Sequence, residues 1–461
     1  MVQPTEVVLP TPPPPDNGRG GLREVGWLAY PVILSQISST VMGVVDSAMV
    51  GRLGATELGA VGFAGIWCWT LFSFFFGTAT GVQTFVSQDH GAGREERCGQ
   101  WAWQTLWLVV PAALLAAGIV SMVQEEALRL LGPSSELQLA ASEYLRPRLI
   151  GAVGMTLAFV WISFFRGIGD TRTPMIAAIL ANVVNVGLDY ALIFGNFGFP
   201  AWGVAGAGIA TAVGEWGYAL FVFVAAMRWR RIRDAFATAP VRPQLAALRR
   251  LLRTGVPIGG QWVMDMLTFA VFTTFVARMG DTSMAASQAF VALLSMSFMQ
   301  ASGISVAAST LVGRYVGAGD LEAATRSFWT SQIFAGILSV SIAALFLVAP
   351  DAMMRIFTDD LEVIALGVPL VRLGAFFQLM DAAAIVTSGA LRGAGDTRWP
   401  FVAQSLLGWG LQVPLAWLLG VSWDGGLRAA WIACTIYISI LSLVLFWRFR
   451  SGSWREIDIQ A

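Results

Sequence analysis

The chain has 461 residues, of which 56% are hydrophobic and only 13% are charged. That composition is too apolar for about three water-soluble domains, so we expect a polytopic membrane protein. A net charge of zero argues against nucleic acid as a partner. One histidine and three cysteines without short spacing argue against a metal site or a disulfide framework.

Residues 1–24 are rich in proline and glycine and contain no apolar run, which predicts a disordered cytoplasmic tail rather than a signal peptide. After them, long apolar segments alternate with short polar connections. A membrane-spanning helix needs about 20 apolar residues. On that criterion the predicted helices are 27–50, 59–84, 101–124, 140–164, 173–195, 203–227, 254–278, 285–311, 328–350, 363–390, 400–421 and 426–449.

These twelve helices divide into two lobes of six. The first lobe is predicted over 25–227 and the second over 254–450, with a basic linker, 228–253, between them and a tail, 451–461, after them. Most arginines fall in the linker and in the connections on one side. By the positive-inside rule that side is cytoplasmic, together with both termini.

The motif Arg-Gly-x-Gly-Asp-Thr-Arg-x-Pro occurs twice, at 166–174 and 392–400. The same offset relates Pro31 to Pro257 and Gly77 to Gly303, so the chain consists of two copies of one unit. Six spans are an even number, and both copies therefore enter the membrane from the same side. We expect parallel repeats related by a pseudo-two-fold axis along the membrane normal, with a central cleft between them.

The repeated motif itself has a mainly structural interpretation. Its glycines end one helix, Asp170 or Thr171 caps the next, and Pro174 lies in the first turn of that helix. A role in gating between the halves is the alternative.

Five acidic residues lie inside predicted spans, where one charge costs about 2.5–3.5 kcal/mol on insertion scales. They are Asp46, Asp189, Glu215, Asp265 and Asp381. None has a basic residue three or four positions away on its own helix. Pairing within one helix therefore does not explain them.

Asp46 and Asp189 are predicted at similar depth in the outer part of the first lobe. Asn182, Asn185 and Asp189 recur at helical spacing, so one face of the fifth helix carries three oxygen-bearing side chains. Two carboxylates and amide oxygens suit a shared proton or a small cation. Hydrogen bonding between helices is the structural alternative.

Asp265, Asp381 and Glu215 are predicted near the midplane, where a substrate cavity is expected and a solvated wall is the alternative. Methionines nearby would give an adaptable apolar surface, although ordinary packing also explains them. The other side chains expected around this cavity are Gln83, Gln300, Met264, Met296 and Met299.

The sequence resembles the multidrug and toxic compound extrusion (MATE) family of cation-coupled antiporters. The resemblance covers everything after residue 25. It rests on Pro31 and the Val-Asp-Ser-Ala-Met-Val-Gly-Arg segment at 45–52, on the two repeated loops, and on the duplicated twelve-helix layout.

Within that family the chain looks like the DinF-like branch, in which an Asp in helix one and an Asn-x-x-x-Asp in helix five bind the coupling ion. The resemblance gives that role to Asp46, Asn185 and Asp189, with Thr211 added from helix six. The NorM-like branch relies instead on acidic residues in helices seven and ten, and Asp265 and Asp381 match those as well. Whether one lobe or both couple ions is therefore open.

The resemblance implies an antiporter that exports amphiphilic, mostly cationic compounds in exchange for H⁺ or Na⁺, with Pro31 as a hinge. Na⁺ would bind at Asp46, Asn185 and Asp189. We expect no cofactor, no other metal and no enzyme activity, because the chain lacks a nucleophile paired with a base. A monomer in the bacterial plasma membrane is expected. The alternative is a flippase for lipids or lipid-linked sugars, which would need a more cationic cavity.

Overall fold

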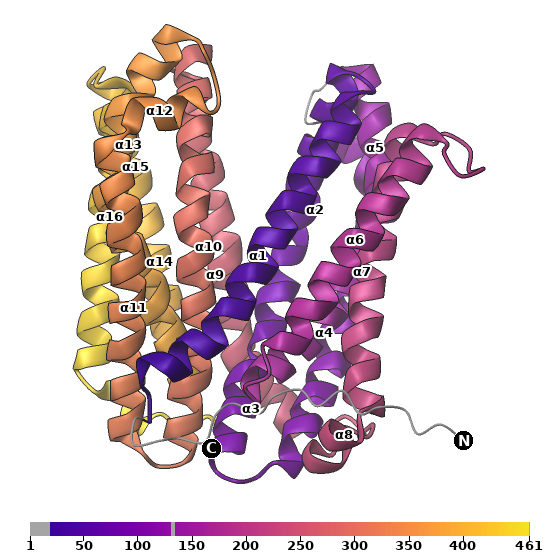
Figure 1. Ribbon diagram of the computed structural model, residues 1–461, viewed down its shortest axis with the longest axis vertical. Coiled ribbons are helices and arrows are strands. Elements are labelled where there is room, and N and C mark those ends of the chain that lie inside the picture. Colours follow the sequence, from indigo (N-terminus) through magenta and orange to yellow (C-terminus); the bar gives the residue numbers. More distant parts are fainter. Residues whose placement is uncertain (1–18, 131–133, 461) are drawn as a thin grey trace.

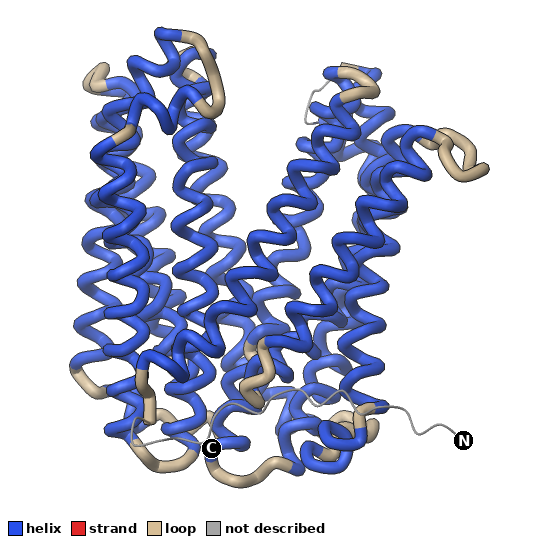
Figure 2. The backbone as a smooth tube through the Cα atoms, viewed as in Figure 1, coloured by secondary structure: helices blue, strands red, loops and turns tan. Residues whose placement is uncertain are grey.

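The computed structural model describes residues 19–130 and 134–460, and these form an all-helical molecule of two lobes (Figures 1 and 2). Twelve helical segments of the described part are long and apolar enough to cross a membrane. The predicted fold class and the number of spans are confirmed. The tail predicted over 1–24 lies mostly outside the described residues, although the first helix already begins at Leu22.

The first lobe contains the helices that precede the linker. They are α1 (Leu22–Gly51), α2 (Ala55–Thr80), α3 (Val82–Gly91), α4 (Glu96–Leu130), α5 (Ser135–Gly167), α6 (Arg172–Phe194) and α7 (Gly203–Arg228). α2 and α3 continue each other and make one span. A short helix, α8 (Arg230–Phe236), then leads to the second lobe.

The second lobe contains α9 (Leu245–Ala277), α10 (Asp281–Gly317), α11 (Leu321–Val348), α12 (Pro350–Arg355), α13 (Leu361–Ala394), α14 (Arg398–Leu407), η1 (Gly408–Gln412), α15 (Val413–Ala416), η2 (Trp417–Ser422), α16 (Gly426–Arg450) and η3 (Ser453–Glu456). The span predicted over 400–421 is continuous but includes two π-helical stretches around Pro414. Proline has no N–H to donate to the helix, and local π geometry accommodates that loss.

The ninth helix begins inside the range predicted for the linker, 228–253. α9 begins at Leu245 rather than near residue 254. The apolar criterion stopped at the arginines of 249–253, but arginine is a good helix former, and the helix continues through them. The predicted tail after residue 450 also has structure, because the indole of Trp454 is buried against the second lobe.

The two lobes exchange their first helices across the interface. α1 packs against α10 of the second lobe, and α9 packs against α2 of the first. These two contacts are equivalent under the repeat, as the predicted pseudo-two-fold axis requires. In Figure 1, α1 starts beside the second lobe and rises into the first.

Glycines permit this close packing of helices from different lobes. A Cβ added at Gly77 of α2 would lie 2.7 Å from the Cα of Gly259 on α9, closer than real Cβ atoms approach. The repeat-related Gly303 of α10 lies in the same way against α1, at Ala29 and Ile33. Small residues at such contacts let helices approach closely in a bilayer, where no hydrophobic force drives them together.

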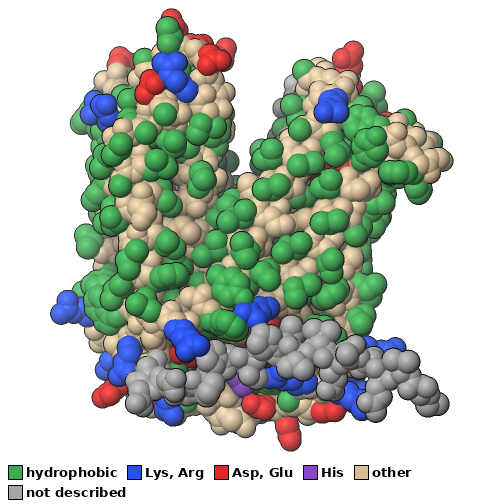
Figure 3. Space-filling view, viewed as in Figure 1, with side chains coloured by type: hydrophobic (Ala, Val, Ile, Leu, Met, Phe, Trp, Pro, Cys, Tyr) green, Lys and Arg blue, Asp and Glu red, His purple; other side chains and the backbone are tan. Residues whose placement is uncertain are grey.

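The lobes meet at one end and separate at the other. The space-filling view shows a hollow between them at the end that carries α12 (Figure 3). We call that end the open end, and the end at which α1 begins and α16 ends the closed end. Apolar side chains cover the flanks of both lobes in this view, and most charged side chains lie toward the two ends. A bilayer would therefore surround the flanks.

Gly77→Ala should destabilise the contact between α2 and α9, because the added methyl group meets backbone atoms that cannot move aside. Overpacking of this kind typically costs about 1–3 kcal/mol. We expect a lower apparent Tm for the variant in detergent. Gly62→Ala is the matched control on the same helix, since nothing lies within 4 Å of its added Cβ. Equal Tm values for the two variants would contradict the close-packing interpretation.

Candidate functional site

The first lobe encloses a pair of carboxylates between two helices. Asp46 of α1 is 8% exposed and Asp189 of α6 is fully buried. Their carboxyl groups lie within hydrogen-bonding reach of each other. Asn185, one turn before Asp189, is also buried. The structure thus brings together the three residues that the sequence analysis grouped.

Most polar atoms of this group have no partner among residues 19–130 and 134–460. One oxygen of Asp46, both oxygens of Asp189 and both polar atoms of Asn185 make no hydrogen bond. Buried polar groups are normally paired, and two carboxylates at close range repel each other when both are ionised. A proton shared by the carboxylates, or a small cation bound to these oxygens, relieves both problems.

The neighbouring residues have different roles. The amide of Asn182 donates to the hydroxyl of Ser38 at 2.8 Å, so this asparagine joins α6 to α1, as the structural alternative proposed. Thr211 of α7 is buried, and its hydroxyl donates to the carbonyl of Ala207 in its own helix at 2.9 Å. The described residues contain no cluster of three or more His, Cys, Asp or Glu side chains suited to a metal ion.

An ion pair that the sequence analysis missed lies beside the carboxylates. Nη1 of Arg148 on α5 is 2.6 Å from Oε1 of Glu215 on α7, and the two side chains are 12% and 13% exposed. Arg148 also attracts the carboxylate of Asp46. The partners are far apart in sequence, and a search within single helices does not find them. Glu215, which the sequence analysis predicted at the substrate cavity, forms this ion pair in the structure.

The second lobe contains its own acidic group. The amide of Gln404 on α14 donates to Asp265 of α9, and the amide of Gln261 donates to Gln404. Asp381 of α13 is close enough to Asp265 to act on it electrostatically, and Tyr437 of α16 is near both. The two second-lobe acids named from the sequence therefore share one site, with amide partners that were not predicted.

The other predicted cavity residues differ in exposure. Gln83 is buried and donates to Thr310 of the second lobe at 3.0 Å. Gln300 is buried and donates to Ser339 at 2.9 Å. Both amides hold helices together in this structure, because polar groups without water must find protein partners, and their cavity-lining role stays a prediction.

The methionines remain candidates for the cavity wall. Met296 is 65% exposed, and Met264 and Met299 are partly exposed. The hydroxyl of Thr40 on α1 donates to the sulfur of Met299 at 3.5 Å, which places Met299 at the contact between the lobes.

At the closed end, each repeated loop is held by the opposite lobe. Thr84 Oγ1 donates to the carbonyl of Arg392 at 2.9 Å, and Thr310 Oγ1 donates to the carbonyl of Arg166 at 2.9 Å. These bonds are equivalent under the repeat. We call them the reciprocal threonine bonds. Thr84 and Thr310 thus join the lobes at the closed end.

Two further bonds strengthen this closure. The amide of Gln88 donates to the carbonyl of Gly393 at 3.0 Å, and the guanidinium of Arg314 donates to the carbonyl of Ile168 at 3.1 Å. Within the first loop, Asp170 accepts bonds from the backbone N–H groups of Arg172 and Thr173, which identifies it as the cap of α6. Burial raises the pKa of this carboxyl, and the bonds from Thr173 and Arg172 oppose the rise.

Comparison with known proteins matches the duplicated architecture. A family model described as MatE matches residues 31–191 and 257–418, one stretch in each lobe. The chain is 33% identical to a probable multidrug resistance protein NorM of Xylella fastidiosa, over 93% of this chain and 91% of the relative. The NorM of Thermotoga maritima is 29% identical over 94% and 93%.

Solved structures share the same fold at lower identity. The crystal structure of MATE in the bent conformation superposes with a TM-score of 0.86 at 20% identity, covering 95% of this chain and 97% of that chain. The eukaryotic MATE transporter AtDTX14 gives a TM-score of 0.83 at 20% identity over 95% and 98%. With a family model matching both lobes and a relative at 33% identity over most of its length, the chain belongs to the MatE family.

Proposed function

We propose that this membrane protein exports amphiphilic, mostly cationic compounds in exchange for H⁺ or Na⁺ moving inward. The relatives named as multidrug resistance proteins support the substrate class. The observation that carries ion coupling is the pair Asp46 and Asp189, whose buried oxygens lack protein partners. Such a pair gains by binding a cation and gives it up when the helices around it move.

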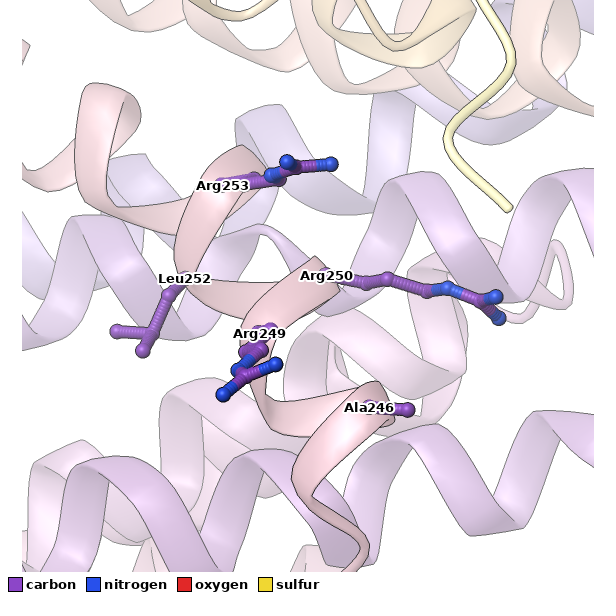
Figure 4. Close-up of a pocket in the computed structure, with 5 residues that line it drawn as sticks. All are labelled: Ala246, Arg249, Arg250, Leu252 and Arg253. Atoms are coloured by element: carbon purple, nitrogen blue, oxygen red, sulfur yellow. The ribbon is translucent and has the colours of Figure 1, made fainter. Parts of the chain in front are cut away.

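The orientation follows from the arginines. Figure 4 shows Arg249, Arg250 and Arg253 projecting from the first turns of α9 around a cavity of about 440 Å³. The connections and the linker at the closed end carry most of the other arginines. We assign the closed end to the cytoplasm by the positive-inside rule. In this conformation the hollow between the lobes then opens outward.

α1 is the element that can carry a signal from the ion site to the lobe interface. It packs against α6, which holds Asp189, and against α10 of the other lobe. Pro31 interrupts its hydrogen bonding where α1 packs on Gly303 of α10, next to Ala29 and Ile33, and Ser35 Oγ donates to the carbonyl of Pro31 at 2.8 Å. A helix bends most easily where a proline removes a backbone bond. Ion binding at Asp46 would therefore shift α1 about Pro31.

The driving force depends on the charge of the substrate, because exchange of one ion for one monovalent cation moves no net charge and uses only the ion gradient. Moving one charge inward is worth about 2.3 kcal/mol per 100 mV of membrane potential. At about 1.4 kcal/mol per tenfold, one ion sustains roughly a fifty-fold gradient of a neutral substrate. The flippase alternative gains no support, because Arg148, the buried arginine it would use, is paired with Glu215.

Asp46→Asn should abolish ion-driven efflux while the protein still inserts and folds, because an amide does not take up a proton at physiological pH and lacks the negative charge that holds Na⁺. The measurement is counterflow in proteoliposomes with pH and Na⁺ gradients imposed separately. Asp359→Asn, in an exposed loop, is the control and should transport like the wild type. Full ion-driven transport by Asp46→Asn would refute the proposed coupling site.

Applied separately to the wild type, the two gradients identify the ion. If H⁺ is the coupling ion, an inward-directed pH gradient drives efflux in Na⁺-free buffer. Coupling to Na⁺ predicts efflux driven by a Na⁺ gradient at equal pH on both sides. Efflux at the same rate without either gradient would contradict antiport.

Replacing both threonines of the reciprocal bonds, Thr84→Val with Thr310→Val, should favour opening of the closed end. Each neutral hydrogen bond is worth about 0.5–1.5 kcal/mol, so the pair should shift the balance by about 1–3 kcal/mol. Spin labels at Ala55→Cys and Asp281→Cys, the first residues of α2 and α10, report the width of the open end. The native cysteines are buried and should not compete for label.

We expect a larger population of short distances between these labels in the double variant. Thr274→Val is the matched control, because its hydroxyl bonds only to the carbonyl of Ala270 in its own helix. Identical distance distributions in the double variant, the control and the wild type would show that the reciprocal threonine bonds do not hold the closed end.

A further inference from the structure

The first lobe contains three carboxylates and one arginine in a small volume. Glu215 and Arg148 form an ion pair at 2.6 Å, and Asp46 and Asp189 face each other beside it. The ion pair is neutral overall. The two aspartates have no cationic side chain in direct contact among the described residues, although the charge of Arg148 still reaches Asp46.

The ion pair with Glu215 does not use all the hydrogen-bond donors of the Arg148 guanidinium. Its Nε and Nη1 make no geometrically aligned hydrogen bond, and the second oxygen of Glu215 has no partner. Arginine normally binds a carboxylate with two parallel bonds, so a single close contact leaves donors free for another acceptor. Asp46, with one unpartnered oxygen, is the nearby acceptor that needs one.

The helix that carries Arg148 is shaped to receive Glu215. A Cβ at Gly151, one turn further along α5, would collide with the second oxygen of Glu215, so the glycine provides the room that this carboxylate occupies. Gly154, the next turn on, provides room for the ring of Trp216 in the same way. Two glycines one turn apart therefore let α7 place Glu215 and Trp216 against α5.

We propose that Arg148 is an internal competitor of the coupling ion and that Glu215 sets the strength of this competition. With the ion bound, Arg148 stays with Glu215. When the ion leaves, the guanidinium is shared with Asp46 and stabilises the emptied carboxylates. The inference rests on the proposed function, because it assumes that Asp46 and Asp189 hold the ion.

The titratable groups that face the guanidinium come from each surrounding helix. They are Asp46 of α1, Cys68 of α2, Tyr144 of α5 and Glu215 of α7, and Asp189 of α6 is next to Asp46. Cysteine and tyrosine are neutral at physiological pH, so the carboxylates alone compete for the guanidinium there. Removing one carboxylate therefore strengthens the hold of Arg148 on the others.

Two variants should shift the ion dependence in opposite directions. Glu215→Gln frees Arg148 for Asp46, so the ion binds more weakly. The H⁺ or Na⁺ concentration for half-maximal counterflow should rise by about tenfold or more. Arg148→Met with Glu215→Gln removes the competitor together with its partner, and the ion concentration should fall below that of the wild type. Replacing a buried ion pair by neutral groups is often tolerated by the fold.

The experiment measures counterflow in proteoliposomes against pH and against NaCl, with choline chloride keeping ionic strength constant. Asp351→Asn is the control, because it removes an exposed arginine–carboxylate pair of the same 2.6 Å length, Arg355–Asp351, and should leave the ion dependence unchanged. Thermal stability of each variant in detergent is recorded alongside. If Glu215→Gln alone fails to fold, the double variant still tests the proposal, because its half-maximal ion concentration must fall below that of the wild type.

The outcomes separate the two proposals. Shifts of both variants in the same direction, or none, while Asp46→Asn has lost ion-driven transport, would overturn the role of Arg148 and leave the coupling site intact. Retained ion-driven transport in Asp46→Asn would overturn the coupling site itself. Opposite shifts of the half-maximal ion concentration in the two variants, with no shift in Asp351→Asn, would support the proposal that Arg148 competes with the ion.

Discussion

The arrangement of the two lobes depends on how they hold each other at the closed end. Thr84 and Thr310 each donate a hydrogen bond to a backbone carbonyl of the opposite lobe. In addition, α1 packs on a glycine of α10, and α9 packs on a glycine of α2. Inside a bilayer, close packing and hydrogen bonds replace the hydrophobic force that joins helices in water. Hydrogen bonds to backbone carbonyls break without exposing buried charge, so they suit the opening and closing that the proposed exchange requires.

Much of this architecture could be predicted from the sequence. Apolar length gave the spans, and the repeated loop gave the symmetry. The group of Asp46, Asn185 and Asp189 could be predicted because two of its members share one helical face and buried carboxylates are rare. The start of α9 was not predicted, because hydropathy indicates only where the apolar span begins. Arginine has a high helix propensity, so the helix itself begins earlier, at Leu245.

Partners on different helices could not be predicted. Arg148 with Glu215, and Asp265 with Gln404, join residues that no local spacing relates. Contacts between the glycines of the repeated motif and the opposite lobe could not be predicted either. Sequence alone explained them as helix ends, but Gly393 also packs against Ser309 and offers its carbonyl to Gln88 of the other lobe. Only the three-dimensional structure shows that this loop, besides joining two helices, also holds the two lobes together.

The lobes share a scaffold and differ in their buried charges. At the position in the second lobe that corresponds to Asp46 stands Phe272, which is buried in an apolar cluster. The first lobe needs more than a pair of carboxylates, because once emptied they would remain as two unpaired charges in a medium of low dielectric. We propose that Arg148 lowers that cost. Because Glu215 also attracts Arg148, the two aspartates can bind the ion again. In the mechanism that we propose, one ion pair thus lets the same pocket both release and recover its ion.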